Sequence, residues 1–247
     1  MQLHFVKNQP ADGYTFGTIG TTAILNGLFK DIPYNFFQDF THLYQYEYWL
    51  SGIVVNAESP WKNLHEFVEY ARKNPGKLRV AYLADSSHMG LRNIQFQKLN
   101  GIQWKHVVFQ GDAPAGTALL GNHVNAATIV ATVWAPLVKA KRLRTLATFE
   151  AKLKEFPDIP KASELGYKYS ADFLGFVGLV APKGLPADVK AIFMDASRKA
   201  WKDPEFQSTM ARIMHPTLYK EGDEWIQFLK NYEKEARSIL KQLKEGK

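Results

Sequence analysis

Residues 78–109 of the chain read LRVAYLADSSHMGLRNIQFQKLNGIQWKHVVF. The apolar run over 78–83 has the composition of a strand, and residues 104–109 form a second run of the same kind. Between these two runs lies a segment with helical spacing of its apolar residues, which ends at Gly101. A strand, a helix and a strand in this order are typical of the α/β class of folds.

The alternation of strand-like and helix-like runs continues along the rest of the chain. Further strands are predicted over residues 14–19, 40–46, 50–56, 126–133, 143–148 and 173–181. Further helices are predicted over residues 23–29, 60–73, 135–141, 186–201, 204–214 and 221–243, with a short one before Gly166. We therefore predict an α/β fold with parallel-rich sheets that are flanked by helices.

Capping residues predict where several helices start. A Thr caps the helix over 23–29, and Ser86 or Ser87 caps the helix that ends at Gly101. Ser59 as N-cap and Pro60 as the first helical residue predict the start of the helix that ends at Asn74. Residues 111–116 are predicted to form a loop before another helix.

Composition and charge exclude several classes of protein. The 247 residues include no Cys, which excludes disulfides and thiolate chemistry. The net charge of +7 invites a nucleic-acid interpretation, but acidic residues interleave with the basic ones along the predicted helices. We therefore predict no nucleic-acid partner. No apolar run has the length that a membrane-spanning helix requires.

The residues that usually carry catalysis or metal binding do not form a recognisable pattern. The seven His show no metal-ligand spacing. The glycine-rich stretch 111–117 lacks the Lys that a P-loop requires, and Ser86–His88 lacks the glycines of a nucleophile elbow. We predict no metal, no cofactor and no enzymatic activity.

Three predicted strand-to-helix junctions carry small hydroxyl or glycine residues. These junctions are Gly20–Thr22, Asp85–His88 and Gln110–Ala113. Each of them alone is better explained as an ordinary helix cap. In an open α/β sheet, however, such junctions gather at the carboxyl ends of the strands, where helix N-termini can hold an anion. The sequence therefore favours an anion-binding site.

Eight motifs in order resemble one family. Residues 11–15, ADGYT, are similar to the (P/A)-D-G-Y-T signature of the tripartite tricarboxylate transporter receptors, the Bug or TctC-like solute-binding proteins. The motifs that follow are QDF (38–40), SP (59–60) with NPGKL (74–78), VVFQG (107–111) with APA (113–115), LLGNHVN (119–125), LRTLA (143–147), DIP (158–160) with ELG (164–166), and LVAPKGLP (179–186).

The resemblance implies a two-lobed fold of the type II periplasmic-binding-protein kind that closes on its ligand like a flytrap. Lobe 1 would comprise 1–50 and 175–247, lobe 2 would comprise 51–174, and the strands over 50–56 and 173–181 would be the crossovers. It also implies a periplasmic monomer that binds a di- or tricarboxylate, an amino acid or an aromatic acid and delivers it to membrane transporter subunits. The ligand-binding residues that it implies are Thr21, Thr22, Ser86, Ser87, His88, Phe109, Gln110, Gly111, Ala113 and Thr132.

The sequence also departs from the family pattern. Family members carry a signal peptide and an opening strand, helix and strand before the D-G-Y-T motif, so we expect a missing front end, with Leu3–Val6 as a substitute strand. Asp85 would repel an anion at the site unless it faces away. Asn125 stands where Asp is common, and Asp112 follows Gly111. The alternatives are a truncated or divergent receptor that acts as a sensory or protein-interaction module without transport, and an enzyme of unknown type.

Overall fold

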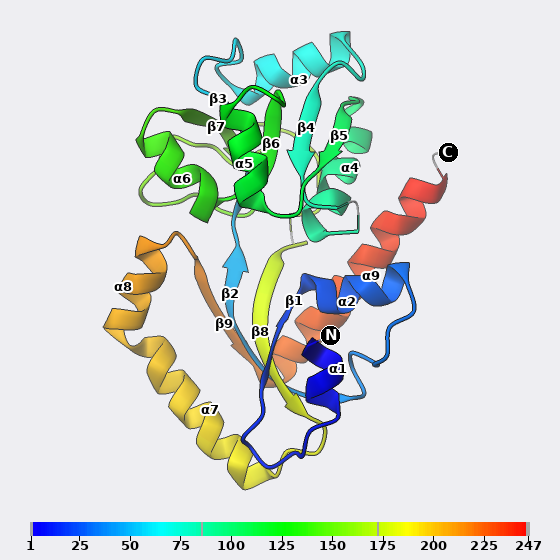
Figure 1. Cartoon of the computed structure of the whole chain (residues 1–247), viewed down its shortest axis with the longest axis vertical. Helices are drawn as coiled ribbons and strands as arrows, with labels where there is room; N and C mark the ends of the chain where they lie inside the picture. The colour runs from blue at the N-terminus through cyan, green and yellow to red at the C-terminus, as the bar shows by residue number, and fades with distance from the viewer. Residues whose placement is uncertain (1, 85, 172, 246–247) are drawn as a thin grey trace. The chain divides into compact units, whose positions relative to one another are not determined.

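The computed structural model describes residues 2–84, 86–171 and 173–245. They form two compact units (Figure 1). The first unit consists of Met1–Tyr48 and Gly175–Arg237, and the second of Trp49–Leu174 and Ser238–Lys247. Each unit has a sheet and a hydrophobic core of its own, so the α/β class and its two-part organisation are present in the structure.

The first unit is built on a four-stranded sheet with the order β1-β8-β2-β9. Its strands are β1 (Gly17–Gly20), β2 (Phe40–Trp49), β8 (Gly175–Pro182) and β9 (Thr217–Glu221). Its helices are α1 (Gln2–Lys7), α2 (Thr21–Phe29), α7 (Ala187–Lys202), α8 (Pro204–Arg212) and α9 (Gly222–Glu245), which begins in this unit. β1 pairs antiparallel with β8, and β2 pairs antiparallel with β9.

Successive side chains of β8 point to opposite faces of this sheet and pack against helices there. Phe176 packs edge-on against Trp225 of α9, with ring centroids 5.3 Å apart. Gly178 points to the same side, where a Cβ atom would lie 2.7 Å from Cζ2 of Trp225. Leu179 faces the opposite side, where it packs with Phe193 of α7. The sheet is therefore covered by helices on both faces.

The N-terminal residues do not form the substitute strand that we expected. Leu3–Val6 belong to helix α1, whose apolar residues Leu3 and Val6 are buried. A Cβ atom at Gly17 of β1 would lie 2.9 Å from Cγ2 of Val6, so the glycine allows this close contact between helix and strand. β1 pairs with β8 at four register positions, from Gly17↔Val180 to Gly20↔Val177.

The second unit is built on a five-stranded sheet with the order β5-β4-β6-β3-β7. Its strands are β3 (Ser51–Asn56), β4 (Arg79–Tyr82), β5 (Lys105–Val108), β6 (Ala126–Val130) and β7 (Leu143–Thr148). Its helices are α3 (Leu64–Lys73), α4 (His88–Asn100), α5 (Asp112–Leu120) and α6 (Ala131–Lys139). β4 runs parallel to β5 and β6, whereas β3 runs antiparallel to β6 and β7.

These pairings correct one part of the predicted fold. The sheets are mixed rather than parallel-rich, because β3 runs antiparallel to both of its neighbours, β6 and β7. In the first unit, the β1 and β9 pairings are antiparallel as well. The α/β class itself is confirmed, since each strand from β3 to β7 is joined to the next by a helix.

Three predicted helix starts are wrong. α3 begins at Leu64 rather than at Pro60, because the Asn63 side chain accepts a hydrogen bond from the Glu66 backbone N–H at 2.9 Å, and Glu66 accepts one from the Lys62 N–H in return. The N-cap of α2 is Gly20 rather than a Thr. α5 begins directly after Gly111, so residues 112–116 are helical and do not form a loop.

The remaining differences concern element lengths. β6 ends at Val130 and α6 begins at Ala131, so the predicted strand was too long and the predicted helix started too late. The segment before Gly166 consists of turns rather than a short helix. Helix α1 and strand β9 were not predicted.

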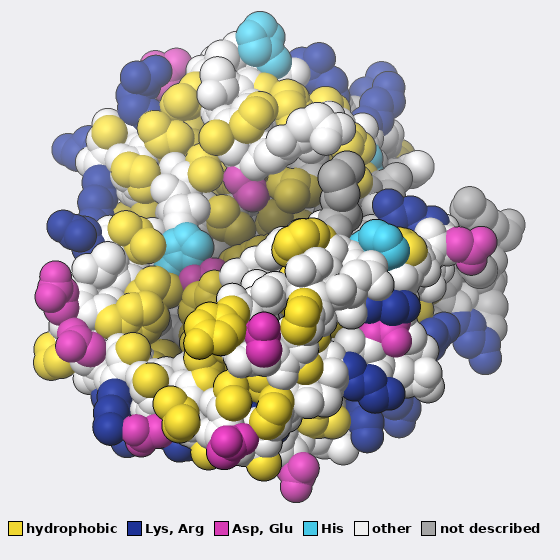
Figure 2. All heavy atoms as spheres, turned by 60° about the horizontal axis from the view of Figure 1, so that its bottom comes forward, with side chains coloured by type: hydrophobic (Ala, Val, Ile, Leu, Met, Phe, Trp, Pro, Cys, Tyr) yellow, Lys and Arg dark blue, Asp and Glu magenta, His cyan; other side chains and the backbone are white. Residues whose placement is uncertain are grey.

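The surface charges are dispersed. On the face in Figure 2, Lys and Arg side chains lie at several separate places, with Asp and Glu among them. Several of the cations pair with a carboxylate one helical turn away, as in Lys199 with Asp195 and Arg237 with Glu233. None of the helices in the described part of the chain is both long and apolar enough to cross a membrane.

Candidate ligand-binding site

The carboxyl ends of three strands meet at one edge of the second sheet. β4 runs parallel to β5 on one side and to β6 on the other, so Tyr82, Val108 and Val130 end their strands at the same edge. Helices α4, α5 and α6 each begin shortly after one of these strands. We call this region the strand-end edge. It brings together three helix N-termini, whose backbone N–H groups and dipoles favour an anion.

The first junction leads from β4 into α4. Ser87 is the N-cap, as predicted for Ser86 or Ser87, and its hydroxyl oxygen accepts a hydrogen bond from the Gly90 N–H at 3.0 Å. Its own backbone N–H donates to the Ala84 carbonyl at 2.8 Å. Ser86 is half-buried beside it. Asp85, which we expected to oppose an anion here, lies outside the described residues.

The second junction leads from β5 into α5. Gly111 is the N-cap with φ at 144°, a conformation that favours glycine. Because glycine has no side chain, the cap itself contributes no oxygen to the first-turn N–H groups of α5. Phe109 is half-buried and extends the pairing with β4 through its N–H to Tyr82 O at 3.0 Å, whereas Gln110 and Ala113 are exposed.

The third junction leads from β6 into α6. Val130 is the N-cap, and valine likewise offers no oxygen to the first turn. The Ala131 N–H is already used, since it donates to the Leu50 carbonyl at 2.8 Å. Thr132 lies half-buried in the first turn of α6, where its hydroxyl adds a polar group to the strand-end edge.

Asp112 places a carboxyl group at this edge. Its Oδ1 accepts a hydrogen bond from the Val130 N–H at 3.3 Å, which links the second and third junctions. Burial raises the pKa of Asp112 to about 6, and the hydrogen bond from Val130 opposes that rise. The side chain is therefore mostly a carboxylate at neutral pH and mostly a neutral acid at pH 5.

A buried polar cluster lies behind the start of α4. It consists of Ser51, His88, Arg92 and Glu150, and we call it the Arg92–Glu150 cluster. Glu150 forms an ion pair with Arg92, and both side chains are only 1% exposed. Glu150 also accepts hydrogen bonds from the Ser51 N–H at 2.7 Å and the Ser51 hydroxyl at 3.0 Å. The cluster thus joins α4 to the first residue of β3 and to the residues that follow β7.

His88 is held inside this cluster. Its Nε2 donates to the Phe173 carbonyl at 3.0 Å, and because a carbonyl only accepts, Nε2 must carry the proton. Burial, and then the positive charge of Arg92, hold the pKa of His88 well below its usual range, and the hydrogen bond to Phe173 opposes this. The ring is therefore neutral and 1% exposed. Arg92 also donates to the Phe173 carbonyl, so two side chains of helix α4 bind the backbone at Phe173.

Of the ten predicted ligand-binding residues, eight belong to the second unit and lie at the three junctions of the strand-end edge: Ser86, Ser87, His88, Phe109, Gln110, Gly111, Ala113 and Thr132. Thr21 and Thr22 belong to the first turn of α2 in the first unit. Thr22 is exposed, whereas Thr21 is 1% exposed and its hydroxyl has no hydrogen-bond partner among the described residues. The role of all ten in binding stays a prediction.

Sequence reasoning missed Ser51, Arg92 and Glu150. Only one local signal was available, because Arg92 follows His88 by four residues and therefore lies on the same face of the helix. Glu150 is 58 residues further along the chain and carries no motif. Within the part of the chain that the structure describes, no three His, Asp or Glu side chains gather in a way that could hold a metal ion.

Open α/β sheets bind their ligands beyond the carboxyl ends of parallel strands, as at this edge. The family model described as the tripartite tricarboxylate transporter family receptor, TctC, matches residues 1–244. The chain therefore belongs to the TctC family, as the motifs had indicated.

Individual relatives are similar over most of this chain. The UPF0065 protein in the gbd 5′ region of Cupriavidus necator is 29% identical over 98% of this chain and 74% of its own length. Alignments with the other curated relatives cover 48% to 68% of their lengths.

Solved structures share the fold. An R. palustris protein solved with adipate has a TM-score of 0.79 and 20% identity, and covers 98% of this chain and 80% of its own. MatC from Rhodopseudomonas palustris, solved with bound malate, has a TM-score of 0.73 and 20% identity, and covers 96% of this chain and 81% of its own. At these identities the likeness concerns the fold alone.

Proposed function

We propose that this receptor captures a small carboxylate at the strand-end edge of its second unit, in the periplasm and as a monomer, for a tripartite tricarboxylate-type transporter. The observation that carries the proposal is the meeting of three helix N-termini at one edge, two of which have N-cap residues without a side-chain oxygen. Such first turns leave backbone N–H groups to bind an anion without a charged side chain.

The ligands of the related structures support this class of solute. Adipate and malate are both dicarboxylates, and they are the molecules named with the two R. palustris proteins. We therefore expect dicarboxylates of four to six carbons to bind this chain ahead of monocarboxylates. Because Lys and Arg exceed Asp and Glu by seven, the overall field also attracts an anion.

A calorimetric titration with malate, adipate and benzoate tests the proposal. Ser87→Ala removes the cap of α4, and Asn63→Ala is the matched control, because it removes the equivalent cap of α3 away from the strand-end edge. Each variant should lose about 1 kcal/mol of stability. Only Ser87→Ala should weaken dicarboxylate binding. Equal affinity in both variants, or no heat from any acid with a folded sample, would count against the proposal.

Asp112 favours a second candidate function, a divergent receptor that acts as a sensory or protein-interaction module without transport. A carboxylate at the edge opposes an anionic ligand at neutral pH. The two functions differ in an uptake assay with labelled dicarboxylate in cells that express the transporter's membrane subunits. Uptake that depends on this chain supports the transport function, and ligand binding without uptake supports the second one.

A further inference from the structure

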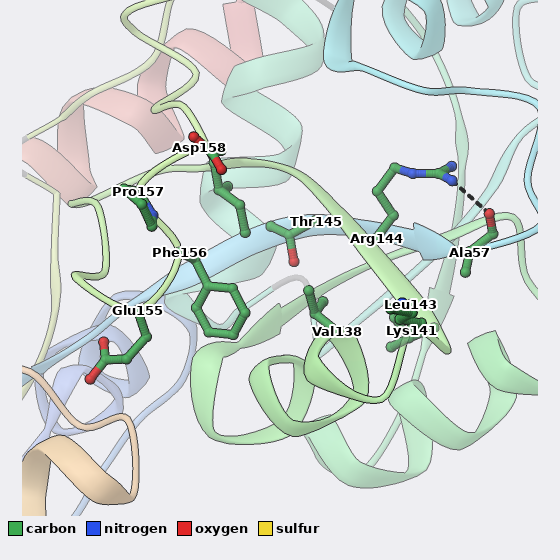
Figure 3. A pocket seen from close by; sticks show the side chains of 11 residues that line it. Ala57, Val138, Lys141, Leu143, Arg144, Thr145, Glu155, Phe156, Pro157 and Asp158 are labelled. Carbon is green, nitrogen blue, oxygen red and sulfur yellow. Dashed lines mark hydrogen bonds between the residues drawn. The ribbon is translucent and has the colours of Figure 1, made fainter.

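A pocket of about 410 Å³ lies on the second unit, away from the strand-end edge (Figure 3). It is formed by the first residues of β7, the last turn of α6 and residues 155–159. Leu143 of β7 pairs with Asn56, at the opposite end of β3 from Ser51. Because Ser51 pairs with Val130 at the strand-end edge, the pocket lies toward the other edge of the sheet.

The centre of the pocket is apolar and its rim is charged. In Figure 3 the ring of Phe156 and the side chain of Val138 point toward one another, and the Thr145 hydroxyl is directed between them. Glu155 and Asp158 are exposed at the rim. Lys139 lies over the Phe156 ring at 5.6 Å from its centroid. Charges of both signs therefore surround an apolar centre.

The one guanidinium in the lining is already occupied. Arg144 donates to the carbonyl of Ala57 at 2.7 Å, to that of Trp61 at 3.0 Å and to that of Ser59 at 3.5 Å. Figure 3 shows its side chain extending toward Ala57 and away from Phe156. Arg144 thus fixes the turn after β3 and is not available as the main anchor for a carboxylate.

Two buried side chains beside the pocket carry polar atoms without a partner. Thr145 is 6% exposed and Trp134 is fully buried. The Thr145 hydroxyl and the Trp134 Nε1 have no hydrogen-bond partner among the described residues. A Cβ atom at Gly52 would lie 2.9 Å from Cγ2 of Thr145, so the methyl group of Thr145 faces Gly52 and its hydroxyl is directed toward Phe156 and Val138 (Figure 3). An unpaired buried donor is costly, and a ligand oxygen would relieve that cost.

We propose that this pocket is a second ligand site, which takes a small uncharged aromatic molecule with one hydrogen-bond acceptor oxygen. The aromatic ring packs on Phe156, which itself packs edge-on against Trp134 with ring centroids 5.4 Å apart. The acceptor oxygen receives a hydrogen bond from the Thr145 hydroxyl. A charged ligand is disfavoured because Arg144 is occupied and the other charges stand at the rim in both signs.

Benzamide is a suitable probe, because it is an uncharged aromatic ring with one carbonyl oxygen. Titration of the full chain with benzamide, followed by ¹H–¹⁵N NMR, should give saturable shifts at the backbone amides of Val138, Thr145 and Phe156. Benzoate, which differs by its charge, should bind this pocket at least 3-fold more weakly. Shifts that are absent, that do not saturate or that map elsewhere would overturn the proposal.

Two variants and a control identify the contacts. Thr145→Val keeps the shape of the side chain and should weaken the affinity for benzamide about 3- to 10-fold, which is the effect of one lost hydrogen bond. Val138→Phe fills the pocket and should abolish the shifts. Thr117→Val makes the same change on α5, outside the pocket, and should leave the affinity unchanged. Unchanged affinity in Thr145→Val would overturn the assignment. Dicarboxylate titrations of the same samples report on the strand-end edge separately, so either site can fail alone.

Discussion

Asp112 sets the electrostatics of the strand-end edge, because it is the carboxyl group that bridges α5 to the end of β6. Its hydrogen-bond donor at the edge is the Val130 backbone N–H. An ionised Asp112 repels a carboxylate ligand at the same edge. A neutral Asp112, or an amide in its place, removes this repulsion and keeps the hydrogen bond from Val130.

Asp112→Asn should stabilise the fold in a pH-dependent way. Burial raises the pKa of Asp112 to about 6 in the folded state, from an ordinary value of 3.8, so ionisation favours the unfolded chain as pH rises through 6. The variant should gain up to about 3 kcal/mol at pH 8, and the gain should shrink toward zero as pH falls to 4. Urea unfolding at several pH values measures this.

Asp195→Asn is the matched control, because Asp195 is exposed and paired with Lys199 on α7. It should leave the stability at pH 8 almost unchanged, because exposed ion pairs contribute little. Malate should also bind the Asp112→Asn variant more tightly than wild type at pH 8, with equal affinities near pH 4.5. A pH-independent gain in stability would contradict this account of Asp112.

The Arg92–Glu150 pair should respond very differently to single and double replacement. Glu150→Leu alone leaves the Arg92 charge buried without its carboxylate and should cost about 3 to 5 kcal/mol. Arg92→Met together with Glu150→Leu removes both charges and should recover much of that loss. Denaturation of both variants and of Arg92→Met alone completes a double-mutant cycle. Additive losses in the double variant would show that the two side chains do not act as a pair.

At the scale of the elements, close packing fixes where strands and helices meet. Gly178 of β8 is one example, since a Cβ atom there would lie 2.7 Å from both Trp225 Cζ2 and the Tyr44 carbonyl oxygen. The carbonyl belongs to the backbone of β2 and cannot turn away. β8 therefore requires glycine at this position to lie between β2 and α9.

Gly178→Ala should destabilise the chain by about 3 kcal/mol, because either the Trp225 ring or β2 must shift. Gly27→Ala on α2 is a suitable control. Its Cβ atom would lie 3.2 Å from Cδ1 of Ile32, which is the end of a flexible side chain, and alanine favours the helix by about 1 kcal/mol. That variant should stay within about 1 kcal/mol of wild type in thermal unfolding. Similar losses in both variants would refute the close-contact explanation.

Elements with local signals could be predicted, and those without could not. α4 has a Ser87 cap and ends at Gly101 in the left-handed conformation, and both lie within the helix's own segment. For α3, both Ser59 and Asn63 are residue types that cap helices, and they lie four positions apart. Asn63 is the N-cap, because its side chain accepts a hydrogen bond from the Glu66 backbone N–H. β9 is half-buried at every position and has no alternating pattern. The contacts of Glu150 could not be predicted from the sequence, because their partners Ser51 and Arg92 are distant in sequence.

The same limit applies to the site. Two of its three junctions, Asp85–His88 and Gln110–Ala113, could be placed from Ser and Gly residues because helix caps are local. The third, at Val130, has no such cap and was not predicted, and the predicted junction Gly20–Thr22 belongs to the first unit instead. That the three junctions share one edge follows from the parallel pairing of β4 with β5 and β6. The pocket beside Thr145 is lined by residues of the LRTLA and DIP motifs, but neither motif indicates a pocket, because the lining comes from segments that are separate in sequence.

At the scale of the whole molecule, the second unit should fold without the rest of the chain. Residues 49–174 are continuous and contain the entire five-stranded sheet, helices α3 to α6 and the Arg92–Glu150 cluster. Their core includes Phe67, Phe96 and Phe149, all with 1% exposure or less. A unit with its own sheet and core has what a domain requires for independent folding.

A fragment of residues 49–174 should therefore unfold in a single cooperative transition, observed by circular dichroism in urea. Its free energy of unfolding should fall less steeply with urea concentration than that of the full chain, because less surface is exposed on unfolding. The complementary fragments, 1–48 and 175–237, are separate in sequence, and neither alone contains the four strands of the first sheet, so neither should unfold cooperatively. A gradual loss of signal from the 49–174 fragment would show that its core depends on the rest of the chain. If the fragment folds, it also locates the second ligand: the benzamide pocket lies wholly within it, so benzamide binding should be retained.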